Sequence, residues 1–144
     1  MSLQPETKLH LDVAERLNEL GLLWMHPANG GKRGKVEASI LKGMGVKAGV
    51  PDIIIFTPPP ALQFKRGAYI ELKDDGKLPS KPQLEWMAAL DNVGWVGMVC
   101  RSLDAVEGCM LAWGYTTPTP KRIGLVTERW TPEQGRDFFE RGRK

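Results

Sequence analysis

The chain has 144 residues, a length that allows one domain with one sizeable hydrophobic core. Its 20 basic and 17 acidic side chains give a formal net charge of +3, which does not indicate nucleic-acid binding by itself but allows a phosphate-facing patch. No apolar run approaches membrane-spanning length and the amino terminus lacks a signal sequence, so we expect a cytoplasmic protein with no membrane partner. Cys100 and Cys109 are expected to be buried reduced thiols, because no histidine or cysteine lies at metal-ligand spacing.

Residues 6–20 are predicted to form an amphipathic helix that ends at Gly21. At about 100° per residue, Glu6 projects onto the buried stripe of this helix and His10 lies at the edge of the stripe. A buried acid is costly unless it is paired, which makes Glu6 a candidate metal-site carboxylate; the alternative is an N-terminal acid that complements the helix dipole. The stripe itself consists of Leu9, Val13, Leu17 and Leu20.

A strand is expected over residues 22–26, followed by a loop over residues 27–35 that combines glycine with basic side chains. Glycine lets backbone amides approach a phosphate closely, and lysine and arginine supply positive charge. The loop therefore predicts contact with a phosphate backbone, and a flexible solvated turn is the alternative. The basic residues are Lys32, Arg33 and Lys35.

A second helix is predicted over residues 36–44, with Val36, Ile40 and Leu41 facing inward. Two apolar runs follow, at residues 49–56 and 68–73. Each is rich in β-branched or aromatic residues and bounded by glycine and proline, so we predict two strands. The proline-rich segment 57–67 is expected to join them as a hairpin connection.

The two predicted strands carry different patterns. In the first strand, Ile53 and Ile55 face opposite Ile54 and Phe56, and apolar residues on both faces predict a strand covered on both sides. In the second strand, Ile70 and Leu72 point one way, whereas Tyr69, Glu71 and Lys73 point the other way.

Paired strands would bring Asp52, at the mouth of the first strand, towards Glu71, with Lys73 beside them. Two adjacent carboxylates repel each other unless a cation compensates their charge. A divalent metal supplies that charge, and hard oxygen ligands are those that Mg²⁺ accepts. With a lysine to hold or polarise water, this set of residues indicates phosphodiester hydrolysis.

The remaining elements complete the expected fold. A capping box from Ser80 to Gln83 begins a third helix, residues 95–100 form a strand, and Ser102 caps a fourth helix over residues 103–113. The inward residues of the fourth helix are expected to include Val106, Met110 and Leu111. This order predicts an α/β fold, a mixed central sheet with helices on both faces.

We assign residues 1–114 to a core domain and residues 115–144 to a basic extension. The extension is predicted to hold an edge strand over residues 123–126 and a helix that starts at Thr131. It either contacts DNA or a second subunit, or is an ordinary charged helix.

The ordered motifs of the chain resemble those of a nuclease superfamily. Pro51-Asp52 followed by Glu71-Leu72-Lys73 is similar to the PD-(D/E)XK motif. The segments at residues 45–52, 69–73 and 82–86, in that order, resemble the VRR-NUC branch, the virus-type replication-repair nucleases. The resemblance covers about residues 6–113 and implies a restriction-endonuclease-like fold.

The resemblance also implies a metal site. Asp52 and Glu71 would bind Mg²⁺ or Mn²⁺, with the Leu72 carbonyl as a further ligand and Glu6 as a ligand either directly or through water. Lys73 would position the nucleophilic water.

Four other residues are assigned by the same resemblance. Gln83 would orient Lys73 or the nucleophilic water. His10 stands where related proteins carry glutamine, so it either binds the water or phosphate that the amide would bind or only completes the packing. His26 and Asn29 fall in a run similar to His-x-x-Asn-Gly-Gly, which implies that His26 supports the site and that Asn29 joins the basic loop in binding DNA.

Free-standing proteins of the VRR-NUC branch act as homodimers on branched DNA such as Holliday junctions. The resemblance therefore implies a structure-selective endonuclease of replication, repair or recombination in a bacterial or phage-infected cell. Two alternatives stay open: a catalytically silent nucleic-acid-binding module, and a small restriction-type nuclease with base-specific contacts.

Overall fold

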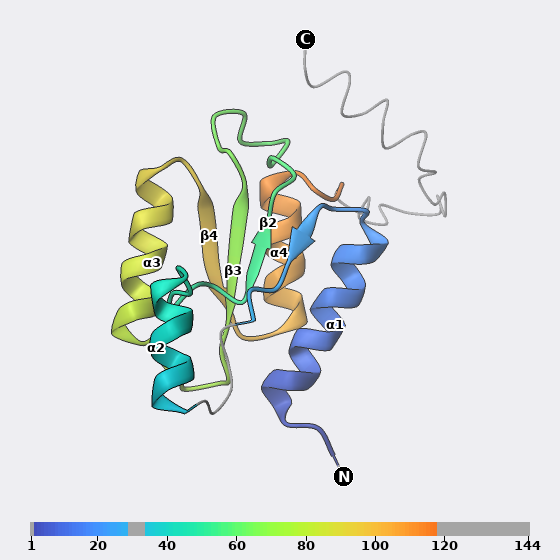
Figure 1. Cartoon of the computed structure of the whole chain (residues 1–144). Helices are drawn as coiled ribbons and strands as arrows, with labels where there is room; N and C mark the ends of the chain where they lie inside the picture. The colour runs from blue at the N-terminus through green and yellow to red at the C-terminus, as the bar shows by residue number, and fades with distance from the viewer. Residues whose placement is uncertain (1, 29–33, 118–144) are drawn as a thin grey trace, which may run out of the picture.

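The computed structural model describes residues 2–28 and 34–117, which form a mixed four-stranded sheet with helices on both faces (Figure 1). This is the α/β architecture that the element order predicts. In chain order, the elements are α1 (Pro5–Glu19), β1 (Trp24–Met25), α2 (Lys35–Gly43), β2 (Ile53–Ile55), β3 (Ala68–Leu72), α3 (Lys81–Asn92), β4 (Val96–Cys100) and α4 (Leu103–Trp113).

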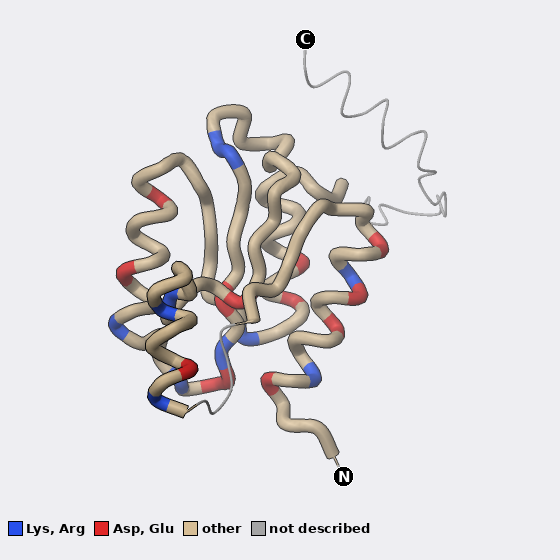
Figure 2. Tube along the Cα trace, viewed as in Figure 1, with Lys and Arg blue, Asp and Glu red and all other residues tan. Residues whose placement is uncertain are grey.

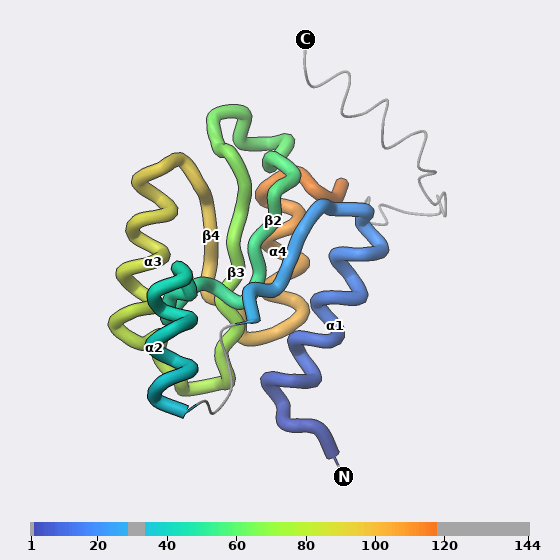
Figure 3. Tube along the Cα trace, viewed as in Figure 1, coloured from blue at the N-terminus to red at the C-terminus, as the bar shows by residue number. Residues whose placement is uncertain are grey.

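The strands lie in the sheet in chain order, β1-β2-β3-β4. β1 pairs with β2, and β2 with β3, in antiparallel fashion, and Ile53 lies opposite Ile70. β3 and β4 are parallel, a pairing that needs a crossover connection, and α3 supplies it. The path from α1 through β1 to α2, and then back along β2, can be followed in Figure 3.

The hydrophobic core lies between the sheet and the helices α1 and α4. Val13 and Leu17 of α1 and Val106 and Met110 of α4 are fully buried against the isoleucines and leucine of β2 and β3. Arg16, which projects near this stripe, forms an ion pair with Glu107 of α4. α1 is thereby held to the core by both apolar and charged contacts.

The other face of the sheet carries α3. The Tyr69 hydroxyl of β3 donates a hydrogen bond to Asp91 Oδ1 of α3 at 2.7 Å. The neighbouring position on β4 is Gly97, where an added Cβ would overlap the Tyr69 ring. The absence of a side chain at Gly97 therefore makes room for the tyrosine that joins sheet to helix.

The predicted helix ends are confirmed. Ser80 and Gln83 form the capping box of α3, and the Ser102 side chain accepts a hydrogen bond from the Ala105 amide at the start of α4. Gly114 ends α4 in the left-handed conformation, with φ of 85°.

Three expectations about side-chain burial are wrong. Val36 and Ile40 of α2 are 76% and 58% exposed, because α2 has no buried residue and no element covers its apolar stripe among the described residues. Leu111 is 44% exposed, because the buried stripe of α4 runs through Val106, Cys109, Met110 and Trp113, and Leu111 lies about 100° from Met110. Phe56 is exposed, so β2 is covered fully only on the face of Ile53 and Ile55.

The other observations concern the thiols, the extension and membrane spans. Cys100 and Cys109 are buried free thiols with their sulfur atoms 3.7 Å apart, as expected. The edge strand and helix predicted after residue 117 lie outside the described residues. Within residues 2–28 and 34–117, no helix is long and apolar enough to cross a membrane.

Candidate active site

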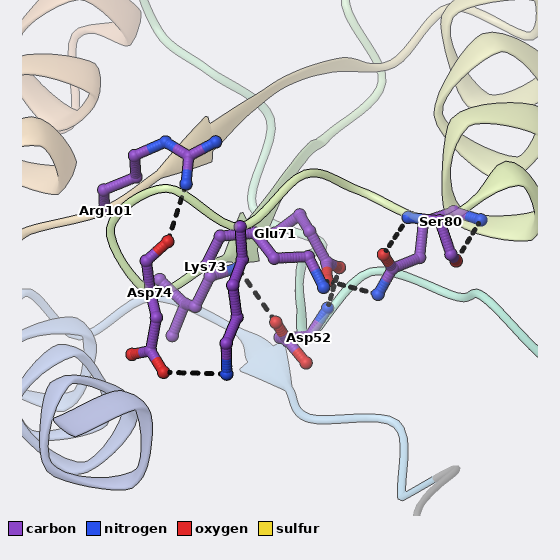
Figure 4. Close-up of polar contacts among 9 residues, drawn as sticks. Asp52, Glu71, Lys73, Asp74, Ser80 and Arg101 are labelled. Carbon is purple, nitrogen blue, oxygen red and sulfur yellow. Dashed lines mark hydrogen bonds and ion pairs between the residues drawn. The ribbon is translucent and has the colours of Figure 1, made fainter. Parts of the chain in front are cut away.

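Glu71 is the most deeply buried charged residue of the candidate site. It lies on β3, on the face that carries α3, and is 2% exposed. Its Oε1 accepts a hydrogen bond from Gln83 Nε2 at 2.6 Å, and its Oε2 accepts one from the backbone amide of Asp52 at 3.2 Å (Figure 4). Both oxygens are therefore held in place by neighbouring elements.

Asp52 directly precedes β2 and is half-buried. Its Oδ2 accepts a hydrogen bond from the Leu72 amide at 2.8 Å, while its own amide donates to Glu71. The ends of β2 and β3 are thus linked in both directions. This reciprocal pairing holds two carboxylates at one end of the sheet, where acidic and basic positions of several segments gather (Figure 2).

Lys73 is the residue after β3 and lies on the same side of the chain as Glu71. Its Nζ is 3.6 Å from Glu71 Oε1, and its side chain is 15% exposed. An amine so placed stays close to the carboxylate and still reaches solvent. The turn after Lys73 is braced by Arg101, whose Nη1 donates to the Asp74 carbonyl at 2.7 Å.

Gln83 has two roles at once. Its side-chain oxygen accepts from the Ser80 amide at 2.8 Å, which completes the capping box of α3. Its side-chain nitrogen donates to Glu71. The two roles that the sequence allowed for this glutamine therefore occur together.

The approach of the Asp52 segment to α3 depends on Gly49. This residue has φ of 85°, a left-handed conformation that favours glycine, and an added Cβ would lie 2.5 Å from the Pro82 carbonyl carbon. Pro82 is in the first turn of α3, next to Gln83. Gly49 therefore lets the chain pass close to that turn as it delivers Asp52 to the site.

The electrostatics of the site disfavour two negative charges. Burial and, after it, the nearby Asp52 carboxylate together raise the pKa of Glu71 to about 7, although Lys73 acts in the opposite direction. Two ionised carboxylates at this place are therefore unfavourable unless a cation lies near them. A cation bound between these carboxylates would therefore stabilise the site.

A second group of possible ligands lies beside the first. His10 of α1, His26 after β1 and Asp52 each offer one ligand atom, and these three atoms lie within 4.8 Å of one another. The rings of His10 and His26 meet edge to face, with their centres 4.3 Å apart. Burial lowers the pKa of His10, and the adjacent His26 lowers it as well.

Glu6 is half-buried one turn before His10, and its charge acts on the His10 ring. It therefore faces inward as predicted, although it does not belong to the group of three ligand atoms. A cleft of about 660 Å³ lies in front of these residues. Glu6, His10 and His26 line it together with Trp24 and Lys77.

The structure brings together most of the residues that the sequence singled out. Asp52, Glu71, Lys73 and Gln83 form one connected network, and the Leu72 amide takes part in it. Lys35 is exposed at the start of α2. The loop residues Asn29, Lys32 and Arg33 lie outside the described residues.

The pairing of His10 and His26 with Asp52 was missed at the sequence level. A signal for part of it was available, because antiparallel pairing of β1 and β2 puts the residue after Met25 next to the residues before Ile54. Continued by one residue, this register puts His26 opposite Ile53, next to Asp52, and the His26 ring is hydrogen-bonded to the Asp52 carbonyl.

Comparison with known proteins supports the architecture. No protein-family model and no curated protein matches the chain. A solved structure described as a "VRR_NUC domain protein" matches with a TM-score of 0.60 and 24% sequence identity, over 78% of this chain and 90% of that one. The chain has the VRR-NUC fold. At the level of the fold, this likeness confirms the resemblance drawn from the sequence motifs.

Proposed function

We propose that the chain is a metal-dependent endonuclease that hydrolyses phosphodiester bonds in DNA. The observation that carries this proposal is the buried Glu71 carboxylate, which is linked to Asp52 and Gln83 and lies 3.6 Å from the Lys73 amine. A fold held together only by packing has little use for two acids and a lysine at the ends of paired strands. The likeness to a protein named for a nuclease domain supports the same function.

The residues at the site fit a divalent cation by their chemistry. Carboxylate and carbonyl oxygens suit Mg²⁺ or Mn²⁺, and here they would come from Asp52, Glu71 and the Leu72 carbonyl, with Glu6 as a ligand directly or through water. The raised pKa of Glu71 agrees with a carboxylate that needs a neighbouring positive charge to stay ionised. When bound, such an ion supplies charge neutralisation at the scissile phosphate and lowers the pKa of a coordinated water.

The chain's own side chains then hold and orient the reactants. Lys73 keeps the nucleophilic water beside Glu71 and the phosphate, since its amine is held near the carboxylate but is not enclosed. Gln83 fixes the Glu71 oxygen that faces Lys73, so it orients the lysine through that carboxylate. His10 and His26 support the site from the side of the cleft.

DNA binding is proposed for the segment between β1 and α2. Lys35 at the start of α2 would contact the phosphate backbone, together with Asn29, Lys32 and Arg33 of the preceding loop. Such contacts position the duplex but do not read its sequence. The basic extension over residues 115–144 would add to this surface or join two subunits.

The test of the catalytic assignment is the variant Lys73→Ala. We expect loss of cleavage of duplex and branched DNA with Mn²⁺ present, with an unchanged circular dichroism spectrum and unchanged metal uptake. Lys81→Ala is the matched control, because Lys81 is an exposed lysine on α3 that makes only a long ion pair with Glu85. Wild-type cleavage by the Lys73 variant would refute the role of this lysine.

A catalytically silent nucleic-acid-binding module would use the same basic surface without a metal. Calorimetric titration with Mg²⁺ and Mn²⁺ separates the two hypotheses. We expect metal uptake that Asp52→Asn abolishes, and the absence of any uptake that depends on Asp52 would favour the silent module.

We further propose that the enzyme is a homodimer that selects branched DNA. One small subunit offers one site, and the resolution of a junction needs two incisions. Four-way junctions, flaps and linear duplexes should be compared as substrates, together with the mass of the protein in solution. A monomer with no preference among these substrates would refute this part, and cleavage confined to one base sequence would favour a restriction-type enzyme.

A further inference from the structure

We propose that His10, His26 and Asp52 form a metal-binding position that holds a transition-metal ion of the Zn²⁺ or Co²⁺ class more tightly than Mg²⁺. The three residues share Asp52 with the Asp52–Glu71 pair, so the position adjoins the site described above. The position would lie next to the Mg²⁺ or Mn²⁺ ion of the proposed nuclease and share its Asp52 ligand, and in that respect the inference rests on the proposed function.

The geometry of the three ligand atoms is close to that of a metal site. The atoms lie within 4.8 Å of one another. In a tetrahedral site, ligands at about 2.1 Å from the ion are about 3.4 Å apart, so a pair at the 4.8 Å limit would need to close by about 1.4 Å to share an ion. Small rotations of the two imidazole rings would achieve this closure.

The hydrogen bonding of His26 sets its ring in a ligand form. Its Nδ1 lies 2.6 Å from the Asp52 carbonyl oxygen, which can only accept, so Nδ1 carries the proton. The neutral ring then has its lone pair on Nε2. A backbone carbonyl that holds one ring nitrogen while the other binds metal is a common arrangement around metal-binding histidines.

The three residues come from segments that the fold holds firmly. His10 lies on α1, whose Val13 and Leu17 are fully buried one and two turns further on. His26 follows β1, and Asp52 precedes its partner strand β2. The core and the sheet register therefore set the backbone positions of the three ligands, so their convergence needs only side-chain movement.

The types of atom in the group decide the class of ion. Imidazole nitrogen suits zinc, copper, iron and nickel, whereas Mg²⁺ prefers carboxylate, carbonyl and water oxygens. With two nitrogens and one oxygen, the position favours the ions that lie above manganese in the order of transition-metal affinities. The cleft of about 660 Å³ is lined by both histidines, which leaves the position open to exchange with solvent.

The composition of the chain makes a direct test simple. His10 and His26 are the chain's only two histidines, so in the full-length protein without an affinity tag every imidazole signal comes from this group. We would titrate the protein with Zn²⁺ and follow the ring resonances of both histidines by NMR. We expect both rings to shift together and to saturate at one equivalent, and a large excess of Mg²⁺ should not reverse the shift. Binding of Zn²⁺ only at Cys100 and Cys109 would leave the rings unmoved and would overturn the inference.

Two variants extend the test to affinity. His10→Gln, measured by calorimetry, should bind Zn²⁺ at least about tenfold more weakly and bind Mg²⁺ as the wild type does. His26→Asn should behave in the same way. Glu15→Gln is the matched control, because Glu15 is exposed on α1, away from the group, and its loss should leave Zn²⁺ affinity unchanged.

The outcomes separate this inference from the proposed function. Rings that do not respond to Zn²⁺, or a His10→Gln variant with wild-type Zn²⁺ affinity, would overturn the inference even if the protein cleaves DNA with Mg²⁺. If both rings bind Zn²⁺ but the protein cleaves no DNA, the metal position is supported and the proposed nuclease function is refuted. Since the titration of the wild-type rings needs no variant, misfolding of a variant does not weaken the test.

Discussion

Replacement of Glu71 by glutamine is expected to remove a pH dependence of stability that the wild-type protein shows when no metal is bound. Glu71 is 2% exposed, and burial together with the Asp52 carboxylate raises its pKa from the usual 4.5 to about 7. The folded chain therefore keeps a proton on Glu71 between these two pH values, whereas the unfolded chain releases it. Stability linked to this proton is present below pH 4.5 and is lost as the pH rises through 7.

The size of the effect follows from the shift in pKa. One pKa unit corresponds to about 1.4 kcal/mol, so the free energy of unfolding should fall by about 2 to 3 kcal/mol between pH 5 and pH 8 because of Glu71 alone. His10 acts in the opposite direction, since its lowered pKa makes stability rise with pH. The contribution of His10 is present in both proteins, so to a first approximation it cancels in the difference between wild type and variant.

The measurement is urea unfolding of both proteins in the presence of a chelator, at several values between pH 5 and pH 8. From pH 5 to pH 8, the free energy of unfolding of the wild type should fall by about 2 to 3 kcal/mol relative to that of Glu71→Gln. Added Mn²⁺ should restore wild-type stability at pH 8 by about 2.7 kcal/mol at one hundred times its dissociation constant, and should do little for the variant. Parallel pH profiles for the two proteins would refute the link between burial of Glu71 and its raised pKa.

Two further predictions concern Gln83 and Gly97. Gln83→Ala should lower the free energy of unfolding by about 1 kcal/mol and also reduce cleavage, because both side-chain hydrogen bonds of Gln83 are lost. Ser80→Ala removes only the acceptor for the Gln83 amide at the helix cap. It should lower stability but keep more activity than Gln83→Ala in a cleavage assay. Gly97→Ala should destabilise the protein by about 1 to 3 kcal/mol in thermal or urea unfolding, since the new methyl group would overlap the tyrosine ring of β3. Gly108→Ala is its control on α4, where a Cβ meets no atom within 4 Å, and it should be neutral or stabilising; equal destabilisation by both alanines would contradict the packing argument.

Much of the fold could be predicted because its signals are local. The alternation over residues 68–73 places Glu71 opposite the core residues Ile70 and Leu72, and the capping serines mark the starts of α3 and α4. The burial of α2 was predicted wrongly for a physical reason. A period of three to four residues shows that Val36 and Ile40 share a face, but it does not show whether another element covers that face.

The same difference between local signals and long-range packing applies to the candidate site. Asp52, Glu71, Lys73 and Gln83 were found because their types and order are distinctive, and the structure joins them in one network. The contact of His26 with Asp52 depends on the register between β1 and β2, which a two-residue strand hardly signals in the sequence. The approach of His10 depends on how α1 packs, which is a property of the whole core.

The double use of the Gln83 side chain has a dynamic consequence. Its oxygen closes the first turn of α3 and its nitrogen steadies the buried acid, so unwinding of that turn would also release the acid. Local opening of a helix end costs much less free energy than global unfolding. Deuterium uptake at the Ser80 and Gln83 amides should therefore report how often the Glu71 carboxylate loses its hydrogen bond from Gln83. Slower uptake on addition of metal would show that opening of the turn and release of Glu71 occur together.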